Sequence, residues 1–264
     1  MLDLGRQGHL AVRGGVGLTG VGEPGEVGAA HGFGGPGEPA WQVLTAGSGR
    51  GYGGSCHTGG VGVYRDQVLP RGIDLVMRGR EFAGPRSRAA AGLEGEVLEI
   101  GFGSGLNIPF YPAGLKRVRA VDPAPAGRRL AARRAAAGPV PVEYAGSDAQ
   151  ALPVGDASVD SVLSTWTLCT IPDAARALAE IVRVLRPGGA LRFVEHGLAP
   201  DARVARLQRR LTPLQRLAFG GCHLDRRIDQ LVAAAGFELT RLDTYYMQGP
   251  RALGYTFEGV AVRP

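Results

Sequence analysis

The spacing of hydrophobic positions changes at about residue 64, and from there to the end the chain alternates between helical and strand periods. Over residues 69–77, apolar side chains recur every three or four positions with arginines between them, which predicts an amphipathic helix that begins near Pro70. A second helix is predicted over residues 85–92. The apolar run EVLEI at residues 96–100 ends abruptly in glycines, as is typical of a buried strand that enters a tight turn.

The remaining chain predicts an α/β protein in which strands and helices take turns. Further strands are expected at residues 117–121, 140–144, 158–164, 190–195, 239–246 and 255–262, and helices at residues 124–137, 174–185, 201–219 and 225–235. Such alternation favours right-handed crossovers and a mainly parallel, seven-stranded sheet with helices on both faces. The last two strands follow one another without a helix, so we expect them to form an antiparallel pair at one edge.

Residues 1–60 differ in composition from the rest, because they hold 20 of the 43 glycines and few aromatic or β-branched side chains. Such a segment cannot bury enough apolar surface to offset the entropy of ordering the chain. We therefore expect a Gly/Pro-rich disordered tail over residues 1–60 and one domain over residues 61–264.

Charge and cysteine content narrow the class of protein. The net charge of +6 comes from arginines that are scattered over several predicted helices, so a nucleic-acid partner is not expected. The sequence shows no apolar stretch that could span a membrane and no signal peptide, which favours a cytoplasmic location. Cys56, Cys169 and Cys222 form no CxxC pair and have no histidine at a zinc-binding spacing, so no metal site is predicted. None of these features predicts the oligomeric state.

The motif EIGFGSG carries the main chemical signal, with Glu99 in the first strand and glycines at positions 101, 103 and 105. Glycines there let the backbone turn sharply and approach a ligand at the carboxyl end of the strands, where open sheets bind ligands. A dinucleotide-binding turn would need glycine in place of Leu106, so a nicotinamide cofactor is disfavoured.

Two further acids follow the next strands. Asp122 ends RVRAVD, where a carboxylate can accept hydrogen bonds from two ribose hydroxyls, and Asp148 in SDAQALP is placed to accept from an adenine amino group beside the Ala149 amide. Each acid alone has a structural alternative, as a helix N-cap or a turn residue. Together with the glycine motif they predict a nucleoside site at three strand ends.

These motifs resemble those of the class I S-adenosylmethionine-dependent methyltransferases over about residues 64–264, with LRPGG at residues 185–189 before the fifth strand. The resemblance implies their Rossmann-like fold and S-adenosylmethionine as cofactor. It assigns the cofactor site to Glu99, Gly101, Phe102, Gly103, Gly105, Asn107, Asp122, Pro123, Asp148, Ala149 and Thr165.

A narrower resemblance, to the thiol S-methyltransferases and their bacterial relatives, lies in WTLCTIPD, FVEHG and FGGCHLDR at residues 166–173, 193–197 and 219–226. It implies a small-molecule acceptor, with a thiol as the favoured group. A lipid or quinone methyltransferase, and a cofactor-binding module without turnover, remain as alternatives. Acceptor specificity is not encoded in any single motif.

Methyl transfer from a sulfonium mainly requires alignment of donor and acceptor, and a thiol acceptor must also lose its proton. Glu195 and His196 at the end of the fifth strand, and His223 in GGCHLDR, are the candidates for that step. The structural alternative for each histidine is a capping or satisfied core residue. Cys169 and Cys222 are interpreted as inert buried thiols.

Residues 201–219 predict a basic amphipathic helix with a kink at Pro213. Its apolar stripe and that of residues 69–77 are both interpreted as a cap over one pocket. Weak contact of this basic helix with an anionic membrane surface is the alternative.

Overall fold

The computed structural model describes residues 68–264. The tail expected over residues 1–60 and the start of the domain at residue 61 lie outside these residues, so both stay predictions.

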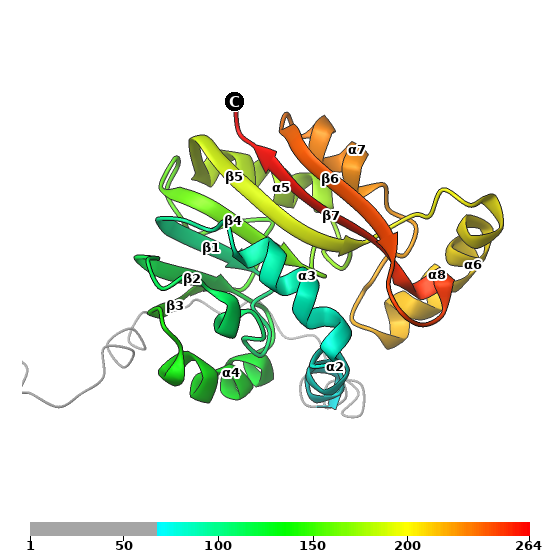
Figure 1. Ribbon diagram of the computed structural model, residues 1–264, viewed down its shortest axis with the longest axis horizontal. Coiled ribbons are helices and arrows are strands. Elements are labelled where there is room, and N and C mark those ends of the chain that lie inside the picture. The colour runs from blue at the N-terminus through cyan, green and yellow to red at the C-terminus, as the bar shows by residue number, and fades with distance from the viewer. Residues whose placement is uncertain (1–67) are drawn as a thin grey trace, which may run out of the picture. The chain divides into compact units, whose positions relative to one another are not determined.

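A seven-stranded sheet forms the centre of the described domain, in the order β3-β2-β1-β4-β5-β7-β6 (Figure 1). The strands are β1 (Glu96–Ile100), β2 (Arg117–Val121), β3 (Val142–Gly146), β4 (Val159–Thr165), β5 (Leu185–His196), β6 (Glu238–Tyr246) and β7 (Tyr255–Val262). The first five pair in parallel, and β7 lies antiparallel between β5 and β6. The predicted antiparallel pair at one edge is confirmed, with β6 outermost.

The helices are α2 (Leu69–Met77), α3 (Arg80–Ala90), α4 (Pro125–Ala137), α5 (Ala174–Val184), α6 (Ala202–Ala218), α7 (Ile228–Ala234) and the short α8 (Arg251–Gly254), with a 3-10 turn η3 (Ile108–Phe110) after β1. The predicted start of the second helix at residue 85 is wrong, because α3 begins five residues earlier, after Gly79. Pro85 is buried within α3, where it lacks the amide proton for one helical bond without ending the helix. Pro213 likewise lies inside α6.

Two apolar layers cover the faces of the sheet. On one face, α5 and α7 pack with Leu178 and Ile228 against Leu98 and Phe193 of the strands. On the other, α3 and α4 contribute Ala90 and Ala131 to a layer over Val97, Val118 and Leu163. Figure 1 shows α3 crossing the front of the sheet with α5 and α7 behind it. Successive residues such as Val97 and Leu98 thus bury opposite faces, as expected for a doubly covered parallel sheet.

The proline and glycines of LRPGG suggested a separate turn before β5. The structure has no separate turn there. Leu185 already pairs with Val159, and the ladder resumes only at Ala190 opposite Ser161, so the intervening residues form a bulge within β5. Gly188 has φ +79°, a backbone conformation that favours glycine. The bulge lets the chain pass from α5 into the sheet without an added loop.

Asp74 fixes α2 to the glycine turn after β1. Although α2 is amphipathic, this acid is buried, and its carboxylate accepts hydrogen bonds from the hydroxyl of Ser104 and from Arg134 Nη1 at 3.0 Å. Arg134 of α4 also donates to the Ser104 carbonyl at 2.6 Å. These bonds place α2 beside the carboxyl edge of the sheet.

The described part of the chain contains no helix long and apolar enough to cross a bilayer.

The close approach of α4 to the glycine turn generates a first prediction. A Cβ added at Gly127 would lie 2.8 Å from the carbonyl oxygen of Gly103, which is backbone and cannot rotate away. We expect Gly127→Ala to lower the free energy of unfolding by about 1–3 kcal/mol, as overpacking does. Urea unfolding followed by circular dichroism measures the change.

Gly72→Ala is the matched control, because Gly72 lies within α2 with no atom within 4 Å of the added Cβ. It should raise stability by about 0.5–1 kcal/mol, the usual gain for alanine in an exposed helix. Equal effects at both positions would contradict tight packing of α4 on the turn.

Candidate functional site

The carboxyl ends of the parallel strands bring the candidate residues to one edge of the sheet. Glu99 is the fourth residue of β1, Asp122 follows β2, Thr165 ends β4, and Glu195 and His196 end β5. Because these strands are parallel, their ends meet at the same edge, where open α/β sheets bind ligands.

The glycine turn uses left-handed backbone at all three glycines of the motif, with φ +69° at Gly101, +55° at Gly103 and +75° at Gly105. The Gly101 amide donates to the Val121 carbonyl at 2.8 Å, so the turn is fixed to the end of β2. A Cβ at Gly101 would lie 1.8 Å from Thr167 Oγ1, whereas one at Gly103 would find its nearest atom at 3.8 Å. Gly101 is therefore needed for packing, whereas an added carbon at Gly103 would make an ordinary van der Waals contact.

Asp122 joins the turn to the second strand end. Its carboxylate is buried and accepts hydrogen bonds at 2.7 Å from the amides of Gly103 and Ala124. Burial raises its pKa, against these two hydrogen bonds and the charge of Arg128. Each oxygen accepts one of these bonds and keeps a further lone pair, so the turn role and a ligand role are compatible. Pro123 next to it is exposed.

Asp148 lies in a surface turn after β3 rather than at a helix N-terminus. It is exposed and accepts hydrogen bonds from the backbone and side-chain nitrogens of Gln150, at 2.8 and 3.0 Å, which lower its pKa. Ala149 beside it is buried. The structure thus supports a turn role for Asp148 and leaves its ligand role a proposal.

Glu99 is the centre of a buried polar network. It accepts from Asn107 Nδ2 at 3.0 Å and from the Tyr111 hydroxyl, while Arg86 donates to Asn107 Oδ1 at 2.7 Å and to Thr165 Oγ1 at 3.0 Å. Burial raises the pKa of Glu99 to about 7, against these hydrogen bonds and the Arg86 charge.

Arg86 and Tyr111 are partners in this network that the sequence pattern does not reveal. No motif contains them, and they meet Glu99 only when α3 and the segment after η3 close over β1.

Trp166 forms an aromatic wall at the end of β4. Its backbone has φ +52°, and its amide donates to the Val194 carbonyl at 2.7 Å. Phe82 packs edge-on at 5.2 Å between ring centroids, and the Arg86 guanidinium lies 4.9 Å over the indole. A bulky side chain in this conformation costs about 1–3 kcal/mol, so neighbouring contacts must keep the backbone in place. Strained backbone of this kind is found most often at functional sites.

Glu195 is fully buried and binds the loop after β4. It accepts hydrogen bonds from Ser164 Oγ at 2.6 Å and from the amides of Thr167 and Cys169 at 3.1 Å. Burial raises its pKa against these bonds. Its carboxylate therefore holds the backbone of this loop in position and does not face a free methyl acceptor.

His196 lies in a cluster with two cysteines that are far apart in the sequence. Cys222 Sγ is 3.7 Å from Cys169 Sγ and 3.7 Å from His196 Nδ1, and both thiols are buried. The hydrogen bond with the Cys169 thiol and then His196 lower the pKa of Cys222 against its burial, while that hydrogen bond and burial raise the pKa of Cys169. Sequence spacing contained no signal for this cluster.

His223 follows Cys222 directly and is tied to the other cysteine. Its amide donates to the Cys169 carbonyl at 2.8 Å, and its Nδ1 lies 3.2 Å from the same oxygen. Burial and then Arg226 lower its pKa, which favours the neutral ring. A neutral ring that donates from Nδ1 keeps Nε2 as an acceptor.

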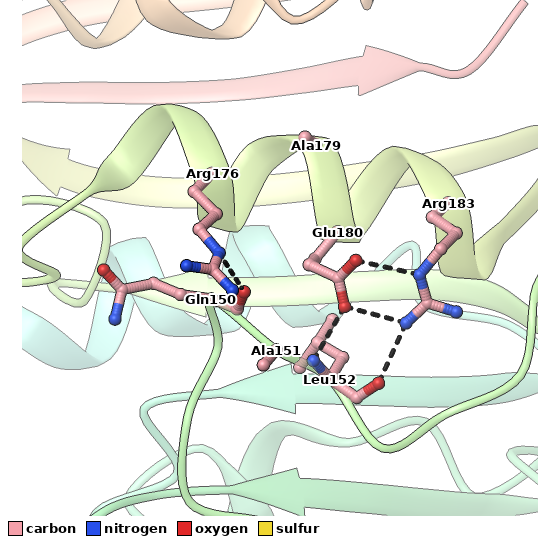
Figure 2. A pocket seen from close by; sticks show the side chains of 7 residues that line it. All are labelled: Gln150, Ala151, Leu152, Arg176, Ala179, Glu180 and Arg183. Atoms are coloured by element: carbon pink, nitrogen blue, oxygen red, sulfur yellow. Dashed lines mark hydrogen bonds and ion pairs between the residues drawn. The ribbon is translucent and has the colours of Figure 1, made fainter.

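A surface hollow of about 340 Å³ lies away from this edge, between α5 and the segment after Asp148 (Figure 2). Several of its polar groups are bonded to one another. Arg176 Nε donates to the Gln150 carbonyl at 2.8 Å, and Glu180 accepts from the Leu152 amide and from Arg183, each at 2.8 Å. These bonds fix the segment to α5.

The two helices interpreted as a cap meet beside the cluster. A Cβ at Gly220, just after α6, would lie 3.7 Å from Leu69 and 3.8 Å from Ile73 of α2. Large apolar side chains on both helices are exposed, namely Ile73, Leu75, Val76, Leu207, Leu214 and Leu217. The segment just after α6 thus lies beside α2, and the role of the two stripes as a cap stays a prediction.

Known methyltransferases are similar to this chain in sequence. Residues 98–193 match the family described as "Methyltransferase domain". The human thiol S-methyltransferase TMT1A is 34% identical over 194 residues, which cover 71% of this chain and 75% of that protein. The rat thiol S-methyltransferase TMT1B is 35% identical over 56% of this chain and 62% of its own length. A phosphatidylethanolamine N-methyltransferase of Cereibacter sphaeroides is 29% identical over 61% of this chain and 80% of that protein.

Solved structures share the fold. A SAM-dependent methyltransferase from Aquifex aeolicus superposes with a TM-score of 0.53 at 19% identity, over 74% of this chain and 98% of that one. The Haemonchus contortus phosphoethanolamine N-methyltransferase 2, in complex with S-adenosyl-L-methionine, gives a TM-score of 0.57 at 18% identity, over 77% and 59%. This chain therefore belongs to the class I S-adenosylmethionine-dependent methyltransferases, in the family that contains the thiol S-methyltransferases.

Proposed function

We propose that this methyltransferase transfers the methyl group of S-adenosylmethionine to the thiol of a small molecule in the cytoplasm. The observation that carries the proposal is the 34% identity to a thiol S-methyltransferase over three quarters of that relative's length. The aromatic wall of Trp166 and Phe82 beside His196 supports it, because such a surface suits a soft, weakly hydrated acceptor.

The strand ends fit the cofactor. An added Cβ at Gly103 would meet no atom closer than 3.8 Å, and Asp122 keeps acceptor capacity next to this turn. Among the described residues, the Tyr144 hydroxyl from the middle of β3 and the Trp166 indole nitrogen are buried without a hydrogen-bond partner. We propose that the adenosyl group lies here, held by Gly101, Phe102, Gly103, Gly105, Asp122, Pro123, Asp148 and Ala149, with Glu99, Asn107 and Thr165 on the side of the methionine.

The bound cofactor supplies an electrophilic methyl group on a cationic sulfur. The chain's own task is to align the acceptor, exclude water and accept the thiol proton. Trp166 and Phe82 exclude water, and His196 and His223 lie where the acceptor proton would leave. Glu195 is proposed as a positioning residue, since its oxygens hold the loop amides.

A lipid acceptor is the second candidate function. It is favoured by the exposed apolar side chains of α2 and α6 and by the relative that carries the name phosphatidylethanolamine N-methyltransferase.

A transfer assay with methyl-labelled cofactor tests the proposal on the full chain. Alkyl and aryl thiols should accept label, and phosphatidylethanolamine vesicles and quinols should not. Label in the lipid alone would favour the second function, and cofactor binding without any labelled product would favour a binding module.

Asp122→Asn should weaken binding of S-adenosylhomocysteine by roughly 10- to 150-fold, since a hydrogen bond to a charged acceptor contributes about 1.5–3 kcal/mol. Isothermal titration calorimetry measures the change. Asp156→Asn is the matched control, because Asp156 is exposed and precedes β4 at the opposite edge of the sheet. Unchanged affinity in Asp122→Asn, with the fold intact, would remove Asp122 from the site.

The charge of Glu99 makes stability depend on pH in a defined direction. Its pKa is about 7 in the folded protein and ordinarily 4.5, so the folded state binds the proton more tightly. This stabilisation is complete below about pH 4.5 and is lost as the pH rises through about 7. From pH 5 to pH 8, the unfolding free energy of the parent should fall by about 2.5 kcal/mol more than that of Glu99→Gln. Urea unfolding of the cofactor-free protein at both pH values measures this, and parallel pH profiles would contradict a raised pKa.

A further inference from the structure

Three soft ligand atoms from separate segments meet at the acceptor side of the site. Cys169 lies in the loop after β4, His196 ends β5, and Cys222 lies between α6 and α7. The two sulfurs and a histidine ring nitrogen all lie within 4.8 Å of one another. Folding alone brings them together, because the segments are 26 or more residues apart in the chain.

The distances are those of ligands around one ion. Zinc–sulfur bonds of about 2.3 Å and zinc–nitrogen bonds of about 2.0–2.1 Å place tetrahedral ligands about 3.6–3.8 Å apart. Both Sγ–Sγ and Cys222 Sγ–His196 Nδ1 are 3.7 Å. The remaining separation, between Cys169 and His196, is no longer than 4.8 Å, so it needs a shift of at most about 1 Å.

The backbone around the cluster is held in place before any ion arrives. Glu195 fixes the Cys169 amide, and the Cys169 carbonyl accepts from the His223 amide, so the two cysteine segments are bonded to each other. Gly221 has φ +98°, and a Cβ there would lie 3.0 Å from the Thr170 carbonyl oxygen. Such support is what keeps metal ligands in position.

Charge and softness favour zinc over a hard cation. Two thiolates neutralise a divalent ion, so the complex can be buried without a net charge. Thiolate and imidazole ligands select zinc, whereas magnesium and calcium prefer oxygen. Leu211 and Leu224 pack against the cysteines on one side, and the half-buried His196 ring lies 6.3 Å from Trp166 on the other.

We propose that Cys169, Cys222 and His196 bind a zinc ion whose fourth coordination position receives the acceptor thiol. Three protein ligands with one open position are the pattern of catalytic zinc sites. The second half of the proposal rests on the proposed thiol acceptor. His196 then acts as a ligand, and the ion takes over the task of favouring the thiolate.

The step balances. On binding, the acceptor thiol releases its proton to solvent and stays as a thiolate. Its sulfur then forms the new S–CH₃ bond, while the sulfonium sulfur of the donor keeps the electron pair of the bond that breaks. The thioether product is neutral and therefore a weaker ligand, so it leaves.

Cobalt and zinc titration of the full chain in the Cys56→Ser background tests the site without turnover. Cys169 and Cys222 are then the only cysteines of the chain. We expect one equivalent of Co²⁺ with a thiolate-to-cobalt charge-transfer band and tetrahedral ligand-field bands, displaced by one equivalent of Zn²⁺. Cys169→Ser and Cys222→Ser should each weaken that band and lower the zinc affinity, and His196→Ala should lower the affinity 10- to 100-fold or more.

His223→Gln is the matched control, because His223 is adjacent but its Nδ1 faces a carbonyl oxygen. It should still bind one equivalent. Absence of the band from the parent would overturn the site whatever the variants do. So would zinc binding that survives loss of both cysteines, or a purified chain that holds no metal and is lighter by the two hydrogens of a disulfide.

Addition of an alkyl thiol to the cobalt protein separates the two halves of the proposal. A shift of the ligand-field bands supports an open fourth position, and no shift overturns that half while the metal site stands. If the thiol shifts the bands but is not methylated, the proposed thiol acceptor fails and the metal site does not.

Discussion

A carboxylate taken out of water is stable only where donors surround it, and this domain buries three of them at the ends of its parallel strands. Glu99, Asp122 and Glu195 each satisfy that requirement by accepting hydrogen bonds, all but the one from Ser164 donated by the segments that follow the strands. The donors are Asn107, Tyr111, Gly103, Ala124, Ser164, Thr167 and Cys169. The loops of the site are thus shaped by the need to satisfy these acids, and disturbing one acid would move backbone as well as charge.

The two halves of the edge use different chemistry. At β1 and β2, the glycine turn and the acids form a polar cradle suited to a nucleoside. At β4 and β5, Trp166, the two thiols and His196 form a softer surface with aromatic character. This division fits the proposed transfer from a charged donor to a polarisable acceptor. Thr165 joins the halves, since its hydroxyl accepts from Arg86 and from Asn107.

The sequence pattern predicted the strands, their alternation with helices and the glycine turn. It could do so because the hydrophobic period and the residues of a turn depend only on neighbouring positions in the chain. The start of α3 was missed, since Pro85 looks like a first-turn residue and lies mid-helix instead. The bulge in β5 was missed because Pro187 and two glycines also suit a free turn. The network around Glu99 and the cysteine–histidine cluster could not be found from spacing, since their members are joined only by the closing of helices over the sheet.

Trp166 links backbone conformation to the evolution of the acceptor side. Glycine or asparagine would adopt its left-handed backbone readily but would remove the ring that packs with Phe82 and Arg86. Another large side chain would keep a surface there and retain the unfavourable torsion. The first kind of replacement relaxes the backbone but loses the ring contacts, and the second keeps a surface but not a relaxed backbone. This position therefore resists gradual change. Divergence in acceptor preference among such enzymes would then be expected to proceed through the residues around the indole.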